Sequence, residues 1–371
     1  MESPEILVVG AGIGGLAAAI ALCDTDARVT VIERDPEWSV YGVGIIQQAN
    51  VVRAMDRLGV LDSFLDAASG FDAVEIFAPD GTKLARVPAR GLVEGKPANV
   101  GIGRRELQRV LADAARERGA QIRLGVTAQS LVDDGEGVDV AFSDGTHGRY
   151  DLVIGADGIA SQMRATLFPD APQPAFTGQA VWRYNLRRPQ GMDALQVYNG
   201  RIGVGLVPMG PGTMYMFVTT PADENAREER AGMAGRMRAH LQDASPAIRA
   251  LADDITDDAE VVYRPLETLL LDGDWHRGRI VLLGDAVHAT TPHLGQGAGM
   301  AIEDAIVLAE ELAKADTPEQ AFAAYRDRRL ERCRYIVESS LAICHGQTGR
   351  GPQIDNHQAT EEMFAVVSQP I

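Results

Sequence analysis

The stretch from Ile280 to Ala305 combines a carboxylate, two histidines and several glycines in an order that suits a ligand-binding loop. Its sequence is IVLLGDAVHATTPHLGQGAGMAIEDA, in which an apolar strand is followed by Gly284, Asp285 and a loop rich in Gly, Thr, Pro and His. A helix is expected to begin at about Ala298. A fixed carboxylate and a helix N-terminus on two sides of a loop can hold a flat, polar and partly anionic molecule.

A second candidate site is a glycine-rich turn near the N-terminus. It follows the β-branched run Ile6–Val9 and precedes the Ala-rich segment LAAAIAL, and its glycines are Gly10, Gly12, Gly14 and Gly15. Such glycines allow a tight turn, close approach of the backbone to a pyrophosphate, and close packing of a helix on a strand. Glu33 ends the next predicted strand, where a carboxylate can accept hydrogen bonds from both hydroxyls of an adenosine ribose. Because a carboxylate there disfavours a 2′-phosphate, the motif predicts FAD or NAD, and the alternative is a structural glycine turn.

Three further segments could contribute to the same site. The strand YDLVIG ends in Asp157 and Gly158, and open α/β sheets bind ligands at strand carboxyl ends. Gly44 stands where a backbone could pass close to a ring system. Arg104 begins the helical stretch RRELQRVLADAARERG, either as a solvated charge or as a hydrogen-bond donor to the dinucleotide.

Residues 175 to 270 differ in character, with aromatic side chains in short alternating runs punctuated by Gly and Pro. The pattern predicts a mostly antiparallel sheet with a helical insert around residues 225 to 251. Trp182 could wall a pocket for a planar ligand, and Arg183 and Arg201 could hold a carboxylate or a ring oxyanion. Tyr215 could contact the same ligand. The alternatives are sheet-core aromatics and solvated charges.

These elements predict an α/β fold: a Rossmann-like FAD-binding domain, a second domain built on a mostly antiparallel sheet, and a long C-terminal helix. The first domain is expected to be discontinuous and to comprise residues 1–71, 100–174 and 275–316. The substrate-binding sheet domain is expected over residues 72–99 and 175–274, with 72 to 88 as a hairpin. Residues 317–371 form the C-terminal helix, which Thr317 caps, and a tail expected to be peripheral.

Composition restricts the partners of this chain. Its 371 residues carry a net charge of −17, from 35 basic and 52 acidic side chains, which argues against nucleic acid and anionic membranes. Three widely separated cysteines predict neither a disulfide framework nor a metal site. No apolar run approaches the ~20 residues of a spanning helix, and the early first strand leaves no room for a signal peptide. We expect a cytoplasmic protein, monomeric or homodimeric.

Three motifs stand in order along the chain: the glycine turn with Glu33, Asp157-Gly158, and Gly284-Asp285 followed by PHLGQG. Together, from residue 5 to about residue 340, they resemble the class A flavin-dependent aromatic hydroxylases of the para-hydroxybenzoate hydroxylase type. The chain is most similar to the short single-component members that act on urate, 6-hydroxynicotinate, salicylate or 3-hydroxybenzoate. A histidine of the hydroxynicotinate enzyme and an arginine of the urate enzyme have no counterpart in register, so no substrate is transferred from either.

The resemblance implies FAD as the cofactor. Glu33 and Arg34 would bind its adenosine end, Val126 would face the adenine through its backbone, and Asp285 would hold the ribityl hydroxyls. Asp157-Gly158 would support the pyrophosphate, and the loop after Leu294 would lie against the flavin pyrimidine ring, where free N–H groups of a helix N-terminus suit negative charge. The residues expected at the cofactor are Gly10, Gly12, Gly14, Gly15, Glu33, Arg34, Gly44, Arg104, Gln108, Val126, Asp157, Gly158, Gly284, Asp285, Pro292, Gly295, Gln296, Gly297, Ala298 and Gly299.

The expected reaction is hydroxylation of a small electron-rich aromatic or N-heteroaromatic ring with NADH or NADPH and O₂, through a C4a-hydroperoxyflavin. Only one dinucleotide fingerprint is present, so the nicotinamide would dock transiently. The alternative is an FAD-linked dehydrogenase or reductase that inserts no oxygen. A phenol reacts best as phenolate, so His293 is the candidate base with a near-neutral pKa, or else an orienting contact. Tyr215 and Pro292 complete the expected catalytic set, Pro292 through its carbonyl and the loop shape, while His288 would brace the loop.

Overall fold

The computed structural model describes residues 3–371 with the exception of 41, 199, 201 and 225–227. Its central element is a six-stranded sheet in the order β18-β19-β12-β1-β2-β8. All neighbours in it are parallel except β18, which is antiparallel to β19. The strands are β1 (Glu5–Val9), β2 (Arg28–Glu33), β8 (Gln121–Leu124), β12 (Leu152–Gly155), β18 (His276–Arg277) and β19 (Ile280–Leu282).

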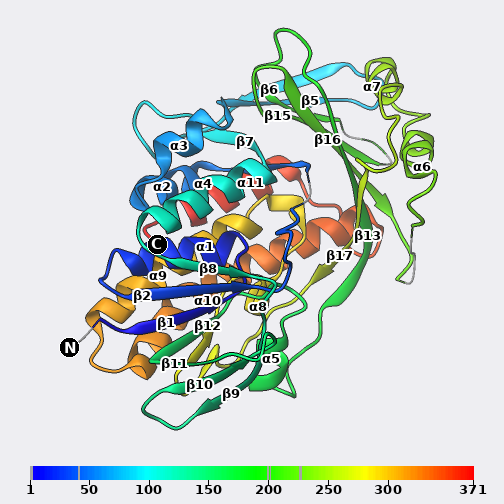
Figure 1. Ribbon diagram of the computed structural model, residues 1–371. Helices are drawn as coiled ribbons and strands as arrows, with labels where there is room; N and C mark the ends of the chain where they lie inside the picture. Colours follow the sequence, from blue (N-terminus) through cyan, green and yellow to red (C-terminus); the bar gives the residue numbers. More distant parts are fainter. Residues whose placement is uncertain (1–2, 41, 199, 201, 225–227) are drawn as a thin grey trace.

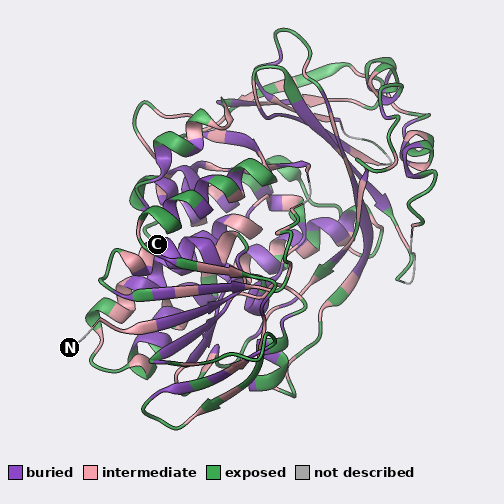
Figure 2. Cartoon of the chain, in the orientation of Figure 1, coloured by how far each residue is buried: buried purple, intermediate pink, exposed green. Residues whose placement is uncertain are grey.

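Helices pack against this parallel sheet and against one another (Figure 1). The Ala-rich α1 (Ile13–Cys23) contacts α4 (Arg104–Glu117) on one side and α9 (Gly297–Lys314) on the other. Its small side chains let α9 approach closely, and the buried residues in Figure 2 concentrate here. The long α10 (Pro318–Gln347) packs on α9, and its first turn is capped because Thr317 accepts from the backbone N–H of Gln320.

The second large sheet has seven strands in the order β17-β13-β16-β15-β14-β5-β6. Its members are β5 (Ala73–Phe77), β6 (Lys83–Pro88), β13 (Ala175–Arg187), β14 (Leu195–Tyr198), β15 (Gly203–Pro208), β16 (Thr213–Pro221) and β17 (Val262–Thr268). All pairs are antiparallel except β14 with β5. One face is covered by α6 (Met233–His240) and α7 (Pro246–Ala252), and the core between them includes Met216, Met237 and Ile248.

Two smaller sheets and several helices complete the fold. One three-stranded sheet contains β3 (Gly44–Gln47), β7 (Asn99–Gly103) and β4 (Ser69–Phe71), and another contains β9 (Ala128–Asp133), β10 (Val138–Phe142) and β11 (His147–Tyr150). The remaining helices are α2 (Ala49–Arg57), α3 (Leu61–Asp66), α5 (Gln162–Leu167), α8 (Asp285–His288), the 3₁₀ turn Pro292–Leu294 and α11 (Asn356–Val367). Among the described helices, none is both long and apolar enough to cross a membrane.

The fold class agrees with the prediction, including the hairpin of β5 and β6, the helix that begins at Arg104 and the helical insert. The helix after the glycine loop begins at Gly297, one residue before the expected position. The expectation of a peripheral C-terminal tail is wrong. Ala359, Met363 and Val367 of α11 are buried, and the Arg53 guanidinium donates to the carbonyl oxygens of Val367 and Ser368, both at 2.9 Å.

Candidate active site

A cavity of about 1150 Å³ lies between the parallel sheet and the seven-stranded sheet. At one end it is lined by the β1–α1 turn and the end of β2, and at the other by the inner face of β5, β13, β14 and β16. The Pro292–Ala298 loop borders it between these ends. The motifs from the first, middle and last thirds of the chain therefore meet at one cavity.

The β1–α1 turn contains glycine for two different physical reasons. Gly10 has φ +109°, and a Cβ there would lie 2.4 Å from the carbonyl oxygen of Ala156; a Cβ on Gly15 would lie 1.9 Å from the Gly10 oxygen. Neighbouring strand and helix backbones exclude side chains at both positions. A Cβ on Gly12 would meet nothing within 4 Å and would project into the cavity that Gly12 and Gly14 line. The open space at Gly12 suits a ligand that approaches the backbone closely.

Glu33 lies at the end of β2 and lines the cavity beside Arg34. Its carboxylate accepts hydrogen bonds from the backbone N–H groups of Ala11, at 3.1 Å, and Asp35, at 3.0 Å. These bonds fix the carboxylate at the mouth of the glycine turn, where a ribose would lie. Val126 is adjacent but does not line the cavity, and its N–H donates to the Glu33 carbonyl oxygen at 2.9 Å. A contact of Val126 with adenine would therefore use its carbonyl oxygen.

Two side chains close over the same turn. Gln108 donates to the carbonyl oxygen of Ala11 at 3.4 Å, and the indole N–H of Trp38 donates to that oxygen at 3.1 Å. Both line the cavity. Trp38 was not expected at the site from the sequence. In the structure its backbone has φ +48°, in the left-handed region that non-glycine residues rarely adopt.

Asp157 retains an unused acceptor next to the cavity. Its Oδ2 accepts from the Met163 N–H at 3.0 Å, while its buried Oδ1 has no hydrogen-bond partner among the described residues. Gly158, the next residue, lines the cavity with φ +78°, and a Cβ there would meet nothing within 4 Å. Together with the space at Gly12 and the fixed Glu33 carboxylate, this unsatisfied oxygen fits a bound dinucleotide.

Asp285 begins α8 after Gly284, whose φ is +65°, and its carboxylate faces the cavity. Desolvation by the surrounding protein raises the pKa of this carboxyl, and the positive charges of His288 and Arg104 oppose that shift. A carboxylate in this position can accept hydrogen bonds from hydroxyl groups of a ligand that spans the cavity.

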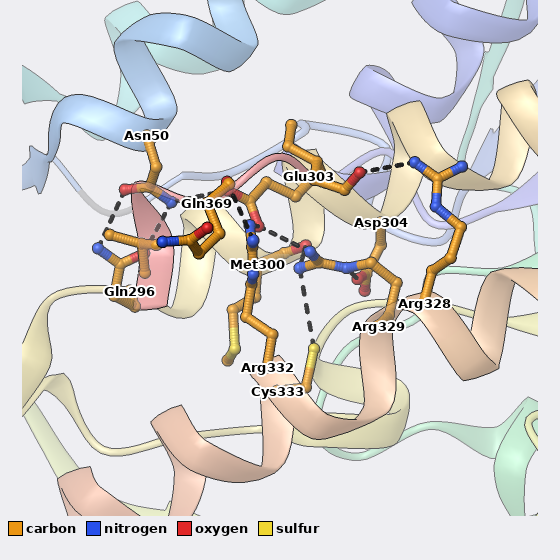
Figure 3. A network of polar contacts seen from close by, with 12 residues as sticks. Asn50, Gln296, Met300, Glu303, Asp304, Arg328, Arg329, Arg332, Cys333 and Gln369 are labelled. Atoms are coloured by element: carbon orange, nitrogen blue, oxygen red, sulfur yellow. Dashed lines mark hydrogen bonds and ion pairs between the residues drawn. The ribbon is translucent and has the colours of Figure 1, made fainter. Parts of the chain in front are cut away.

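The Gly295–Gly299 loop divides between two environments. Gly295, Gly297 and Ala298 line the cavity, as expected for a contact with the flavin ring. Gln296 and Gly299 instead face α2. Gln296 is 1% exposed and accepts from Asn50 at 2.9 Å (Figure 3). Its amide also donates to Gln48. The Gln296 side chain therefore does not line the cavity, because its amide holds the loop on α2.

Arg104, Arg183 and Tyr215 form a charged cluster in the cavity. The guanidinium groups make no hydrogen bond or ion pair with any described residue. Burial lowers the pKa of Arg183 to about 10, assisted by the charge of Arg104, and also lowers that of Arg104. Burial raises the pKa of Tyr215 to about 12, with both arginines opposing the shift. At neutral pH the cluster offers two cations and a phenolic O–H.

His293 lies on the 3₁₀ turn with both ring nitrogens in use. Nδ1 lies 2.9 Å from the Thr291 hydroxyl, and Nε2 lies 3.2 Å from Oε1 of Gln347, which also accepts from Gln179 at 3.0 Å. The amide oxygen can only accept, so Nε2 carries the proton and Nδ1 accepts from Thr291. Burial lowers the pKa of His293 to about 4, with Gln347 opposing the shift. The near-neutral pKa expected of a base is therefore not found.

His288 is fully buried behind the loop. Its Nε2 lies 2.5 Å from Asp304, whose other oxygen accepts from Arg329 at 2.7 Å (Figure 3 shows the pair of Asp304 with Arg329). Burial lowers the pKa of His288, but Asp304 outweighs it, and the net pKa lies well above the ordinary value. Cys333 lies close enough for these groups to resemble a metal triad, but the Arg329 cation already pairs with Asp304. The arrangement braces the loop.

Trp182 does not wall the cavity. It alternates with Arg183 on β13 and lies on the opposite face, where it is 1% exposed and packs against Tyr263 and His240. Its indole N–H donates to Thr220 at 3.2 Å. Pro292 and Tyr215 do line the cavity, whereas Arg201 lies outside the described residues.

A parallel sheet whose strand ends carry a glycine turn, a carboxylate fixed by backbone N–H groups and a second acidic motif is typical of dinucleotide-binding proteins. The chain belongs to the FAD binding domain family, whose sequence model matches residues 3–340. It is 32% identical over 342 residues to 2-heptyl-3-hydroxy-4(1H)-quinolone synthase of Pseudomonas aeruginosa, covering 91% of this chain and 88% of the relative. It is 31% identical over 367 residues to 6-hydroxynicotinate 3-monooxygenase of Pseudomonas fluorescens, covering 91% of each.

Solved structures agree with this assignment. HpxO of Klebsiella pneumoniae, complexed with FAD and uric acid, superposes with a TM-score of 0.84 at 27% sequence identity, over 98% of this chain and 92% of that one. The protein is a flavin-dependent monooxygenase with FAD as its cofactor.

Proposed function

We propose that this enzyme hydroxylates an electron-rich aromatic or N-heteroaromatic ring that carries an anionic oxygen or carboxylate, with NADH or NADPH as electron donor and O₂ as oxidant. The observation that carries the proposal is the cluster of Arg104, Arg183 and Tyr215 at the cavity. Neither guanidinium forms a direct ion pair with a described residue, and only Arg104 has an acidic neighbour, Asp285, whose charge acts on it. Two partly desolvated cations without a direct ion-pair partner favour an anionic ligand.

The cofactor end of the cavity supports the reducing chemistry. Glu33, the open face of Gly12 and the free oxygen of Asp157 would hold the dinucleotide, and Asp285 would accept from the ribityl hydroxyls. The N–H groups at the start of α9 would lie against the flavin ring. When bound, FAD supplies electron transfer from the nicotinamide to O₂ and delivery of one oxygen atom.

Residues at the other end would bind and activate the ring. Arg183 and Arg104 stabilise the deprotonated form of a ring hydroxyl, which raises the electron density that an electrophilic oxygen requires. Tyr215 remains protonated at neutral pH, since its pKa is about 12, and can donate a hydrogen bond. His293, neutral and fixed by Thr291 and Gln347, orients the ring rather than removing its proton.

The names of the relatives support the substrate class. A quinolone, hydroxynicotinate and uric acid are all oxygenated nitrogen heteroaromatics. We also propose that residues 72–99 and 175–274 form the substrate domain and that the remaining segments up to residue 316 form the FAD domain. A cytoplasmic location is a separate proposal.

A panel of rings tests the proposal. The FAD-loaded enzyme is supplied with NADH or NADPH and with hydroxybenzoates, hydroxypyridines, hydroxyquinolines and purines. We expect at least one anionic ring to stimulate NAD(P)H oxidation and to leave as a product with one additional oxygen atom. Stimulated oxidation that yields only H₂O₂, or a dehydrogenated product from every ring, would instead support a reductase or dehydrogenase.

A further inference from the structure

The inner face of the seven-stranded sheet continues the cavity beyond the charged cluster. One row of directly paired residues crosses five strands. From β13 to β5, its members are Arg183, Phe217, Gly205, Val197 and Ile76, each paired with the next. Directly paired residues lie on the same face of a sheet. At about 4.8 Å per strand, four strand steps from β13 to β5 span about 19 Å. The row begins at a cation and is otherwise apolar.

A second row runs beside the first. Tyr215 faces Val207, and on the next strands Leu195 faces Val74, which faces Val87. Leu195, Val74 and Val87 line the cavity and are only partly buried. The nearby charges of β5 and β6 lie on the other face, where Glu75 pairs with Lys83 and Arg86. Val207 itself is buried against Phe71 and Met209, whereas the apolar side chains on either side of it line the cavity.

The floor of this surface is flat because of one glycine. A Cβ on Gly205 would lie 2.1 Å from the ring of Phe217, so the ring occupies the space that a side chain there would need. Val197, Ile76 and Phe217 remain partly exposed beside it and line the cavity. On the opposite face, β13, β15 and β16 are covered by α6 and α7. An apolar face left uncovered next to a binding cavity marks a place for apolar ligand atoms.

We propose that this apolar trough, defined by Phe217, Val197, Ile76, Leu195, Val74 and Val87, binds an alkyl or alkenyl chain attached to the aromatic ring. The inference rests on the proposed function, in which the Arg183 cluster holds the anionic ring. The substrate is then an amphipathic molecule: the ring and its anionic oxygen lie between Arg183 and the 292–298 loop, and the chain extends across β15 and β14 toward β5. The continuity of the trough with the ring site favours a substrate tail over a second copy of the chain.

The test measures how affinity depends on chain length. Two ring series, 6-alkyl-2-hydroxybenzoates and 2-alkyl-4-hydroxypyridines, carry hydrogen, propyl or heptyl, and the Kd of each for the FAD-loaded protein is measured by isothermal titration calorimetry. Full burial of one methylene is worth about fourfold in affinity. We expect heptyl to bind roughly 30-fold or more tighter than propyl in at least one series.

Val197→Asp places a charge at the centre of the trough and should remove most of the gain from propyl to heptyl. Leu84→Asp, at a residue 61% exposed on β6 and outside the cavity, is the matched control and should keep that gain. The flavin absorbance of each variant checks that it is folded and loaded. An affinity independent of chain length in both series, or an equal gain in native protein and Val197→Asp, would overturn the proposal. The proposal would also be overturned if the protein were a dimer that Val197→Asp dissociates and if ligand affinity did not depend on chain length. Tight, chain-dependent binding with no oxygenated product would leave the trough intact and reject the proposed function.

Discussion

At the scale of single side chains, the proposed choice of substrate rests on Arg183 and Arg104. Each keeps its charge at neutral pH, because even the lowered pKa of Arg183 is about 10. The two cations repel each other in a site with little solvent, and Tyr215 compensates neither of them fully. An anionic ring would relieve this repulsion, which makes charge a stronger selector here than shape.

Replacement of Arg183 by Met should therefore weaken binding of anionic rings specifically. Loss of one partner of a buried charge pair costs about 2 kcal/mol or more, which is about 30-fold in Kd. Equilibrium titrations of the FAD-loaded protein with a hydroxybenzoate, and with the uncharged analogue in which the hydroxyl and the carboxyl group are both methylated, measure the difference in Kd. Arg187→Met, an exposed position on the same strand, is the control and should change neither affinity. Equal weakening for the charged and uncharged rings would contradict the role of Arg183.

His293 provides a test by pH. With a pKa of about 4, it is neutral throughout pH 6 to 9, and its ring resonances in an NMR titration should show no midpoint in that range. Between pH about 4 and its ordinary value of 6.5, the unfolded chain binds more protons at this residue than the folded protein does. His293 therefore lowers stability as pH falls through that window, and His293→Gln should lessen the loss. A midpoint near 7 that disappears in His293→Gln would restore the role of a general base.

Local sequence was sufficient for some of these residues and insufficient for others. The glycine turn and Glu33 lie within one strand–helix–strand unit, so spacing alone places them together. Gln347 reaches His293 from 54 residues away, and no local pattern could indicate that contact. The expectation that Trp182 and Arg183 both contact the substrate overlooked strand alternation, which places adjacent residues on opposite faces, and only Arg183 lies on the face that borders the cavity.

At the scale of elements, the β1–α1 turn and the α9–α10 pair hold the site in shape. The turn is determined by backbone contacts at Gly10 and Gly15, while its cavity side at Gly12 is open. In α9, the adjacent Glu303 and Asp304 are both buried, and Arg329 of α10 donates to each at 2.7 Å (Figure 3). Glu303 also accepts from Asn50, which holds Gln296. One polar network thus connects the packed helices α9 and α10 with the 292–298 loop.

Gly12→Ala should separate folding from cofactor binding. The added methyl group meets no protein atom within 4 Å and the backbone at Gly12 is extended, so stability should change by less than about 0.5 kcal/mol. Because the methyl group projects toward the expected pyrophosphate, the Kd for FAD, measured by flavin fluorescence quenching, should rise at least about tenfold. Gly273→Ala, where an added Cβ also meets nothing within 4 Å, is the control and should bind FAD normally. Unchanged affinity in Gly12→Ala would place the pyrophosphate elsewhere.

Arg329→Met should destabilise the whole protein, because it removes the one cation that both buried carboxylates share and leaves Asp304 with His288 and Glu303 with Arg332. Breaking a buried pair in this way costs about 3 to 5 kcal/mol, which urea unfolding would detect as a lower midpoint. The adjacent Arg328 is partly exposed and pairs with Glu310 and Glu311, so Arg328→Met should cost less than about 1 kcal/mol. Similar losses in the two variants would mean that the buried network adds little to stability.

At the scale of the whole molecule, two sheets of different construction enclose one cavity. The parallel sheet could be predicted from its βαβ motif and from the apolar strands before Asp157 and Asp285. For the seven-stranded sheet, the antiparallel strands and the hairpin could be assigned to one domain, but not the parallel pairing of β14 with β5, which joins segments more than 100 residues apart. Likewise, the packing of α11 on Arg53 depends on a contact across 314 residues and left no local pattern.

The overall negative charge of the molecule means that an anionic substrate needs local cations at the site. With a net charge of −17, the molecule repels anions at long range, so an anionic ring needs local cations to enter. Arg104 and Arg183 supply them inside the cavity.

Oxygen isotope incorporation tests the central claim most directly. The FAD-loaded enzyme is given NADH or NADPH and its best ring substrate under ¹⁸O₂ in ordinary water, and the product is examined by mass spectrometry. A monooxygenase predicts one ¹⁸O atom in the ring product, and none when the label is supplied as H₂¹⁸O with ordinary O₂. An oxidised product without ¹⁸O from O₂, or with oxygen derived from water, would contradict the account and identify a dehydrogenase.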